Sequence, residues 1–277
     1  MQLQTQSIPT EKAKPISSLH AMLETLEIQT DAARLNEICN HPEVFPWIKG
    51  PTDEPVDLTE VVTGGDTVTL LGRHGGILFH CLLPEMWEAH TQVVPEGRGP
   101  WALECVQACL AWLYTRTDAM EVVTRCPKGN VAALALAKAA GLSKEFTNPT
   151  GWTKDGQPVP ADIYALRVQD WIRKAPGLVE RGRWFHDRLA GELAKHGAED
   201  LVHPDDEVHD RYVGAAAEMI LGGQPVKGCI LYNRWATMAG YAPIYVASLD
   251  PVAINIGTAL LVVKDGDFGV AAVQKSH

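Results

Sequence analysis

The chain has 277 residues, of which 46% are hydrophobic and 21% charged, as in globular proteins with one large or two smaller domains. The formal net charge of -10 disfavours non-specific binding to a phosphate backbone, so nucleic acid is not the expected partner. The sequence has neither a signal-peptide core at its polar start nor a run of roughly 20 apolar residues, so we expect a cytoplasmic protein that is not a membrane protein.

The first part of the chain predicts helix and then strands. Residues 1–18 are expected to form a flexible arm, and a helical region follows at about Ala21–Cys39. A loop rich in Pro, Asp and Gly spans 49–58. Turn residues then separate three short apolar segments, with Gly75 and Gly76 as the turn between the first two. These segments predict antiparallel strands at Thr67–Leu71, Ile77–Leu83 and Met86–Val94.

The apolar period changes after Gly99. Residues 100–115 carry apolar side chains three and four positions apart, which predicts an amphipathic helix with Pro100 in its first turn. A strand at Met120–Thr124, a buried helix at Val131–Ala140 and a strand at Ile163–Gln169 follow. The order predicts an α/β (mixed α+β) fold with a central mixed sheet flanked by helices.

Residues 176–277 are expected to form a smaller C-terminal α+β module, after a first domain at 19–175. Amphipathic patterns predict helices at Trp184–Lys195, Asp206–Leu221 and Gly228–Met238. Strands are predicted at Ile244–Ala247, Val252–Ile256 and Ala259–Val263, with a hairpin turn at 265–267. The pattern alone assigns this module no function.

A strand, a Gly/Arg turn and a helix start follow one another around Arg98. Backbone N–H groups at a helix start bind anions, and Gly97 and Gly99 allow a ligand to approach the main chain. The segment Val94-Pro-Glu-Gly-Arg-Gly99 resembles the pyrophosphate loop of the GNAT N-acetyltransferase superfamily. Asn130, which opens a helix, and the phrase Ala137-Lys-Ala-Ala-Gly-Leu142 resemble a later motif of that family. The amino-acid sequences of several short segments most resemble those of GNAT-like proteins of tailed bacteriophages.

The resemblance covers about half of the chain and implies a fold that binds acetyl-CoA as co-substrate. It implies that the pyrophosphate lies on the backbone of residues 98–103 and the pantetheine arm along the strand end. The cofactor-binding residues implied are Gln92, Val93, Val94, Arg98, Gly99, Trp101, Ala102, Leu103 and Asn130. The sequence departs from the family pattern at Pro100, which has no N–H group, and at Trp101, which replaces a glycine.

Catalysis by direct attack of an amine on a thioester needs a base and an acid. Strand alternation places Glu88 and His90 on one face, and both are candidates for the base. The family often has a tyrosine acid after the Asn helix, and this stretch offers Lys138 and Phe146 instead.

No metal is expected from the sequence. His203, His209 and Asp210, with His186 and Asp187 upstream, are metal-ligand types, but an ordinary helix start explains the acidic run equally well. The six cysteines have no CxxC spacing and are expected to be reduced core residues.

Three functions remain open. The first is an acyltransferase that uses a CoA thioester and an amine acceptor, either a small molecule or a protein. The second is a GNAT-fold protein without catalysis, which acts as a phage structural or interaction protein, with a homo-oligomer or virion partner bound through the C-terminal module. The third is a DNA-base-modifying acyltransferase, which the acidic charge disfavours unless the basic residues within 173–188 form a local patch.

Overall fold

A computed structural model describes residues 18–49, 53–197 and 205–273 of the chain. Its larger sheet has seven strands in the order β1-β2-β3-β4-β5-β7-β6. The strands are β1 Glu27–Ile28, β2 Thr67–Gly72, β3 Gly75–Leu83, β4 Met86–Val93, β5 Glu121–Pro127, β6 Ser143–Lys154 and β7 Gln157–Arg167. Only β4 and β5 are paired in parallel, and all other neighbours are antiparallel. The sheet is therefore mixed, as the sequence predicts.

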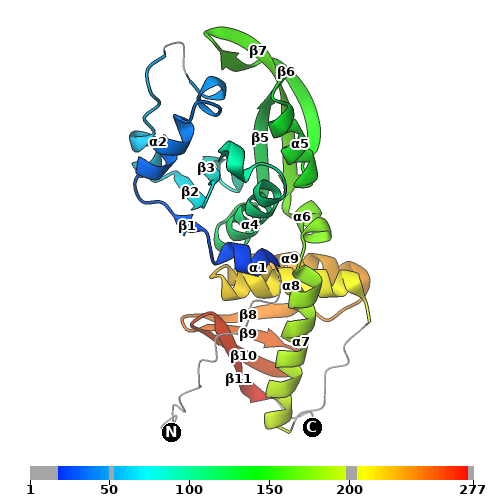
Figure 1. Cartoon of the computed structure of the whole chain (residues 1–277). Coiled ribbons are helices and arrows are strands. Elements are labelled where there is room, and N and C mark those ends of the chain that lie inside the picture. Colours follow the sequence, from blue (N-terminus) through cyan, green and yellow to red (C-terminus); the bar gives the residue numbers. More distant parts are fainter. Residues whose placement is uncertain (1–17, 50–52, 198–204, 274–277) are drawn as a thin grey trace.

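Helices cover both faces of this sheet (Figure 1). They are α1 Ser18–Leu23, α2 Ala33–Cys39, α3 Thr59–Thr63, α4 Pro100–Arg116, α5 Val131–Ala139 and α6 Val168–Lys174, with 3-10 turns η1 Phe45–Trp47 and η2 Pro95–Gly97. Side-chain alternation in the strands sends Ile77 and Phe79 into the core under α4, whereas Leu78 packs with α2 on the other face. The sheet therefore separates a large α4 core from a small α2 core.

Three helices and a second sheet follow. The helices are α7 Leu178–Lys195, α8 Glu207–Leu221 and α9 Pro225–Ala239, and the antiparallel strands β8 Ile244–Leu249, β9 Val252–Ile256, β10 Ala259–Lys264 and β11 Asp267–Val273 have the order β11-β10-β9-β8. The four-stranded sheet lies below α8 and α9 with α7 running alongside it, at the far end of the molecule from β6 and β7 (Figure 1). The predicted fold class, a mixed α+β protein with a smaller C-terminal α+β part, is confirmed.

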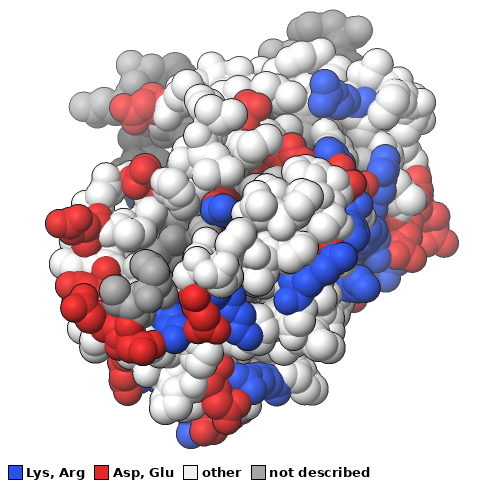
Figure 2. Space-filling model, turned by 90° about the horizontal axis from the view of Figure 1, so that it is seen from above, with Lys and Arg blue, Asp and Glu red and all other residues white. Residues whose placement is uncertain are grey.

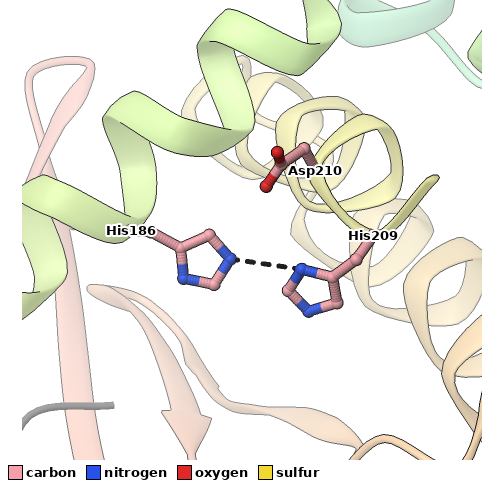
Figure 3. A group of neighbouring side chains, drawn as sticks. All are labelled: His186, His209 and Asp210. Carbon is pink, nitrogen blue, oxygen red and sulfur yellow. Dashed lines mark hydrogen bonds between the residues drawn. The ribbon is translucent and has the colours of Figure 1, made fainter. Parts of the chain in front are cut away.

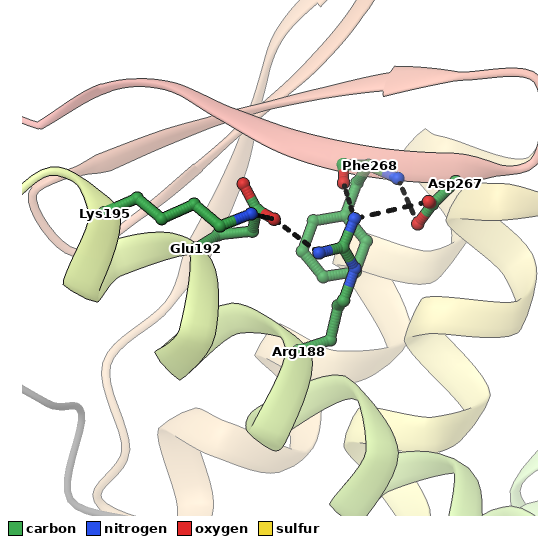
Figure 4. A network of polar contacts seen from close by, with 5 residues as sticks. All are labelled: Arg188, Glu192, Lys195, Asp267 and Phe268. Atoms are coloured by element: carbon green, nitrogen blue, oxygen red, sulfur yellow. Dashed lines mark hydrogen bonds and ion pairs between the residues drawn. The ribbon is translucent and has the colours of Figure 1, made fainter. Parts of the chain in front are cut away.

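Arg188 fastens helix α7 to the edge of the second sheet (Figure 4). Its guanidinium lies over the Phe268 ring, 5.8 Å from the centroid, and Nη2 lies 3.4 Å from Asp267 Oδ2. On its own helix it is ion-paired with Glu192, which also accepts from Lys195 Nζ at 2.7 Å. The long side chain thus joins an aromatic contact to two carboxylates, which holds α7 against β11.

The apolar core continues from the first sheet into the C-terminal part. Buried side chains of α4, α6, α7, α8, α9 and the second sheet belong to one cluster. The division into units at 19–175 and 176–277 stays a prediction, and the shared core means that each part contributes to burying the other's apolar surface.

Several predicted boundaries differ from the structure. The helical region Ala21–Cys39 is interrupted by β1, where Glu27 and Ile28 pair with β2. The predicted strand Ile163–Gln169 is the second half of β7, and its last residues open α6 instead. The turn between β2 and β3 is formed by Arg73 and His74, while Gly75 and Gly76 lie in β3. Of the predicted arm, residues 1–17 lie outside the described residues.

Gly76 is required by the close approach of two strands. A Cβ atom there would lie 2.0 Å from the carbonyl oxygen of Leu70 in β2. Any side chain would therefore separate β2 from β3.

In the described part of the chain, no helix has both the length and the apolar character needed to cross a bilayer.

Candidate active site

The two parallel strands β4 and β5 separate after a short stretch of pairing. Their register joins Met86, Trp87 and Glu88 to residues 121–123, and pairing ends there although both strands continue. At the point of separation, Thr124 Oγ1 donates to the carbonyl oxygen of Ala89 at 2.8 Å. The side chain takes the place of a backbone donor, and beyond it the strand edges face an open cleft.

The cleft has a volume of about 1020 Å³ and a mostly apolar lining. The ends of β4 and β5, the start of α4, the length of α5 and the segment Pro42–Ile48 surround it. Of the predicted site residues, those in the lining are His90, Gln92, Val93, Arg98, Gly99, Ala102, Leu103 and Asn130. A volume of this size is sufficient for a ligand larger than most drug-sized molecules.

Helix α4 begins at this cleft with a turn that only glycine adopts easily. Gly99 has φ 91° and ψ -136°, and Pro100 follows as the first helical residue. The first bond across the helix start runs from Leu103 N to Gly99 O at 3.2 Å. The N–H groups of Trp101 and Ala102 therefore have no carbonyl of their own helix to bond, and they carry the positive end of the helix dipole. This end of the cleft can hold an anion.

Trp101 packs away from the cleft. Its indole meets His74 edge-on, with ring centroids 5.1 Å apart. It covers Gly72 and Gly97, where added Cβ atoms would lie 3.1 and 2.9 Å from its ring. The predicted backbone role of Trp101 stays a prediction, and its side chain packs against His74, Gly72 and Gly97 and is not part of the cleft lining.

Arg98 is engaged by an acidic side chain at the cleft. Its Nη1 donates to Glu43 Oε2 at 2.8 Å, and both side chains are substantially exposed. Glu43 precedes η1 and also lines the cleft. The predicted anion-binding charge of Arg98 is thus partly neutralised by a residue that the sequence did not single out.

The backbone of β4 offers hydrogen-bonding groups on alternate residues. Ala89 directs its carbonyl toward β5, where Thr124 binds it. Because N–H and C=O groups on an antiparallel strand point the same way at every second residue, those of Thr91 and Val93 face the opening, and those of Gln92 face β3. Of the predicted strand edge at Gln92–Val94, Val93 therefore presents its backbone to the cleft, and Thr91, which the sequence did not indicate, does so as well.

Val94 lies beyond the strand edge that faces the cleft. Its N–H donates to the carbonyl of His74 at 3.0 Å, on the β3 side, and its side chain packs with the small α2 core. The structure thus places Val94 outside the lining of the cleft, and its contact with a cofactor stays a prediction.

The side-chain oxygen of Gln92 is buried and accepts no hydrogen bond from any described residue. The residue is 6% exposed, and its Oε1 has no hydrogen-bond partner among the described residues. A buried amide oxygen without a donor costs stability. Since Gln92 lines the cleft, a ligand N–H group is a fitting donor for it.

Glu88, His90 and Arg125 form a connected group on the α2 face of the sheet. Arg125 of β5 donates to Glu88 from Nε and, at 2.8 Å, from Nη2. His90 Nε2 lies 3.4 Å from Glu88 Oε2. Burial of the Glu88 carboxyl acts to raise its pKa, but hydrogen bonds and charges from His90 and Arg125 outweigh it and lower the pKa to about 2.

These interactions distinguish the two predicted catalytic residues from each other. A carboxylate with a pKa near 2 that is held by an arginine is a poor proton acceptor at neutral pH. His90 lines the cleft, whereas Glu88 lies behind it, 4% exposed. His90 is therefore the more accessible of the two predicted bases, and the catalytic role of each stays a prediction. Sequence reasoning missed Arg125, since nothing local connects it to a glutamate 37 positions earlier.

The side-chain oxygen of Asn130 has a structural role. It caps α5, with Oδ1 accepting from Ala133 N at 3.1 Å. The Nδ2 group is the part of this side chain that can donate to a ligand. The prediction that Asn130 reaches toward the cleft is compatible with its place in the lining.

A tryptophan pair closes the far wall of the cleft. Trp152 of β6 donates from Nε1 to the Trp47 carbonyl at 3.1 Å, and Lys154 Nζ lies 4.3 Å from the centroid of the Trp47 ring. Both tryptophans are in the lining, and among the described lining residues none is a tyrosine. The missing tyrosine acid, noted in the sequence, therefore has no replacement from another element of that lining.

The outer surface above the sheet carries charges of both signs. A band of Lys and Arg side chains lies on one side of this face, with acidic side chains beside it (Figure 2). Two ion pairs of β6 and β7 join opposite charges, Lys144 with Asp162 at 2.8 Å and Arg167 with Glu145 at 3.1 Å. Local neutralisation of this kind does not favour a phosphate backbone as ligand.

No family model matches the sequence, and no curated protein matches it. Several solved structures are similar to about half of it. Spermidine N-acetyltransferase from Vibrio cholerae, in complex with CoA and spermine, is 12% identical with a TM-score of 0.45, over 54% of this chain and 99% of that chain. AAC(6')-Ib in complex with ribostamycin and CoA is 19% identical with a TM-score of 0.46, over 55% and 98%. A putative acetyltransferase from Salmonella typhimurium, yncA, with acetyl-CoA, is 18% identical with a TM-score of 0.44, over 52% and 93%.

Proposed function

We propose that this protein transfers an acetyl or other acyl group from CoA to an amine by direct attack of the amine on the thioester. The observation that carries the proposal is the cleft between β4 and β5, which combines parted strand edges with an uncapped helix start. These features offer backbone donors at two separate places, as a long ligand with an anionic end and an amide-containing arm requires.

In this proposal the CoA pyrophosphate binds the amides of Trp101 and Ala102, and Arg98 turns toward it from Glu43. The pantetheine arm runs along Thr91 and Val93 and pairs its amides with their backbone groups, as an added strand does. The Nδ2 group of Asn130 contributes from α5. The buried Oε1 atom of Gln92 accepts a hydrogen bond from an N–H group of one of the two substrates.

The chemistry follows from the group on the α2 face. His90 removes a proton from the amine while the nitrogen attacks the thioester carbonyl, and backbone N–H groups of β4 stabilise the oxyanion. Collapse of the tetrahedral intermediate breaks the C–S bond. In the absence of a tyrosine in the described lining, the proton held by His90 passes to the thiolate, so the products are the amide and free CoA.

Two features of the site support a second candidate, a protein that keeps the fold without turnover and acts as a structural or interaction protein. Arg98 is held by Glu43, and the lining offers no tyrosine acid. Both features disfavour acyl transfer, whereas the cleft itself is retained.

Calorimetry with acetyl-CoA and a thiol-release assay distinguish these candidates. The amines to supply are a polyamine and an aminoglycoside, the ligand classes named for the similar structures. We expect binding of acetyl-CoA and release of free thiol that depends on the amine. Binding without thiol release would support the non-catalytic candidate, and the absence of heat at millimolar acetyl-CoA would contradict the CoA proposal altogether.

A further inference from the structure

Two histidines and an aspartate meet between helices α7 and α8, far from the cleft. His186 comes from α7, and His209 and Asp210 come from the first turn of α8 (Figure 3). One potential ligand atom from each lies within 4.8 Å of the others. These three residues are metal-ligand types in the sequence, where an ordinary helix start explains the acidic run equally well, and only the fold brings the two separate segments together.

Two glycines allow the backbones of α7 and α8 to approach each other closely. A Cβ atom on Gly182 of α7 would lie 2.0 Å from the carbonyl oxygen of Asp210, and one on Gly214 of α8 would lie 2.1 Å from that of Leu178. The two helix backbones are therefore in direct contact. His186 follows Gly182 by about one turn, so its ring is held against the start of α8.

The spacing of the two imidazoles is close to that of two ligands on one ion. His186 Nε2 and His209 Nδ1 are 3.4 Å apart, which is long for an N–H···N hydrogen bond. Two nitrogens bound at about 2.0–2.1 Å in a tetrahedron are separated by roughly 3.3–3.4 Å. The distance between the two nitrogens is therefore compatible with both binding one metal ion.

Burial and contacts with neighbouring side chains fix the positions of the Asp210 carboxylate and the His209 ring. Asp210 is 1% exposed and His209 4% exposed. Arg183 Nε donates to Asp210 Oδ2 at 3.0 Å, the type of outer contact that commonly holds a ligating carboxylate. The His209 ring packs against Tyr241 and Trp235, with centroids 4.6 and 5.5 Å away, which fixes its orientation.

We propose that His186, His209 and Asp210 bind a divalent transition-metal ion, with zinc preferred among the metals for which imidazole is a good ligand. The ion would join α7 to α8 and leave a fourth coordination position for water or another group. This proposal is independent of the acyltransferase, because the site shares no residue with the cleft.

The test uses tag-free full-length protein treated with EDTA and titrated with ZnCl2 in a calorimeter. We expect one zinc per chain and a Tm that rises with zinc concentration, since an ion that binds only the folded state stabilises it. His186→Ala and His209→Gln should abolish the stoichiometric binding. His196→Ala, at the exposed C-terminal cap of α7, is the matched control and should bind like the wild type.

His209 is buried, and its variant could fail to fold, whereas His186 is half-buried and offers a second measurement. Circular dichroism of each variant identifies those that remain folded. Titration with CoCl2 adds a spectroscopic readout, because tetrahedral Co(II) absorbs visible light strongly. A folded His186→Ala variant that binds zinc as tightly as the wild type, or a wild type that binds none, would overturn the proposal in favour of a simple histidine pair.

Discussion

Arg98 and Glu43 form an ion pair, with Nη1 of the arginine donating to Oε2 of the glutamate at 2.8 Å, and both residues line the cleft between β4 and β5. A carboxylate in this position competes with a ligand phosphate for the same guanidinium. We predict that Glu43→Gln strengthens CoA binding by about two- to fivefold, because an exposed pair of this kind is worth about 1 kcal/mol or less.

Calorimetry with CoA measures this effect. Glu37→Gln is the matched control, since Glu37 pairs with Arg34 on the surface of α2. Weaker CoA binding by Glu43→Gln than by Glu37→Gln would show that Glu43 assists the ligand and does not compete with it.

Gly99 provides a test of the helix start. Its φ of 91° and ψ of -136° are strained for any residue with a side chain, although an added Cβ would meet no atom within 4 Å. We predict that Gly99→Ala destabilises the protein by roughly 1–3 kcal/mol and weakens CoA binding at least tenfold, because the turn that presents the α4 amides relaxes.

Gly65→Ala is the control for this change. Gly65 also has a positive φ, 83°, with open space around it, but it does not line the cleft. Denaturant unfolding should show comparable losses of stability for both variants. If CoA affinity is equal in the two, the α4 start is not the phosphate site.

His90 carries the proposed proton transfer. We predict that His90→Gln lowers kcat by about 10²–10⁴-fold, the usual contribution of a general base, while the Kd for acetyl-CoA stays near that of the wild type. His80→Gln is a suitable control, because His80 lies on the neighbouring strand opposite Glu88 and pairs with Asp66. Equal activity of both variants in the thiol-release assay would remove His90 from the mechanism.

Glu88 makes stability depend on pH in the acid range. Its pKa of about 2 is below the ordinary value of 4.5, so the unfolded state binds the proton more readily and stability is lost as pH falls from about 4.5 toward 2. The full effect is roughly 3 kcal/mol, reduced by solvent at the half-exposed Arg125. We predict that Glu88→Gln removes most of this pH dependence, as urea unfolding between pH 3 and pH 6 can measure.

Glu96→Gln, at an exposed position, is expected to leave the acid dependence as it is in the wild type. A wild-type slope that persists in Glu88→Gln would place the titrating group elsewhere.

Local patterns in the sequence were sufficient for most of the elements. The alternation of apolar residues in β3 and β4 and the change of period at Gly99 predicted the strands and α4 close to their true ends. The strand β6 was missed because most of its side chains are exposed and Pro149 and Gly151 interrupt it. Its stability comes from pairing with β7, which no local pattern reveals.

The residues of the candidate site also fall into two groups, those that local sequence predicts and those that depend on distant contacts. Gly99 and Asn130 were found because a turn and a cap are local features. The pairing of Arg125 with Glu88 and the edge-on contact of Trp101 with His74 depend on which segments are neighbours in the fold. Contacts between distant segments decide whether a residue serves the ligand or the fold, and a single sequence does not contain that information.

Lys227 connects the C-terminal helices to the first part of the chain. Its Nζ donates to the carbonyls of Tyr114 at 2.8 Å, in the last turn of α4, and of Thr117 at 3.1 Å and Ala119, which follow that helix. Burial lowers the pKa of this amine to about 8, so the ammonium is held there at a cost that the three acceptors offset. We predict that Lys227→Met leaves these carbonyls without their donor and destabilises the protein by roughly 2–4 kcal/mol.

Lys174→Met is the control, because Lys174 donates to the single carbonyl of Gly141 at 3.3 Å from an exposed position. Thermal unfolding of the full chain, followed by far-ultraviolet circular dichroism, compares the two. Because the apolar core is shared between the two parts, we expect Lys227→Met to lower the Tm of a single transition. Two separate transitions in the variant, with the first part of the chain still folded after the other has melted, would show instead that residues 19–175 are an independent domain.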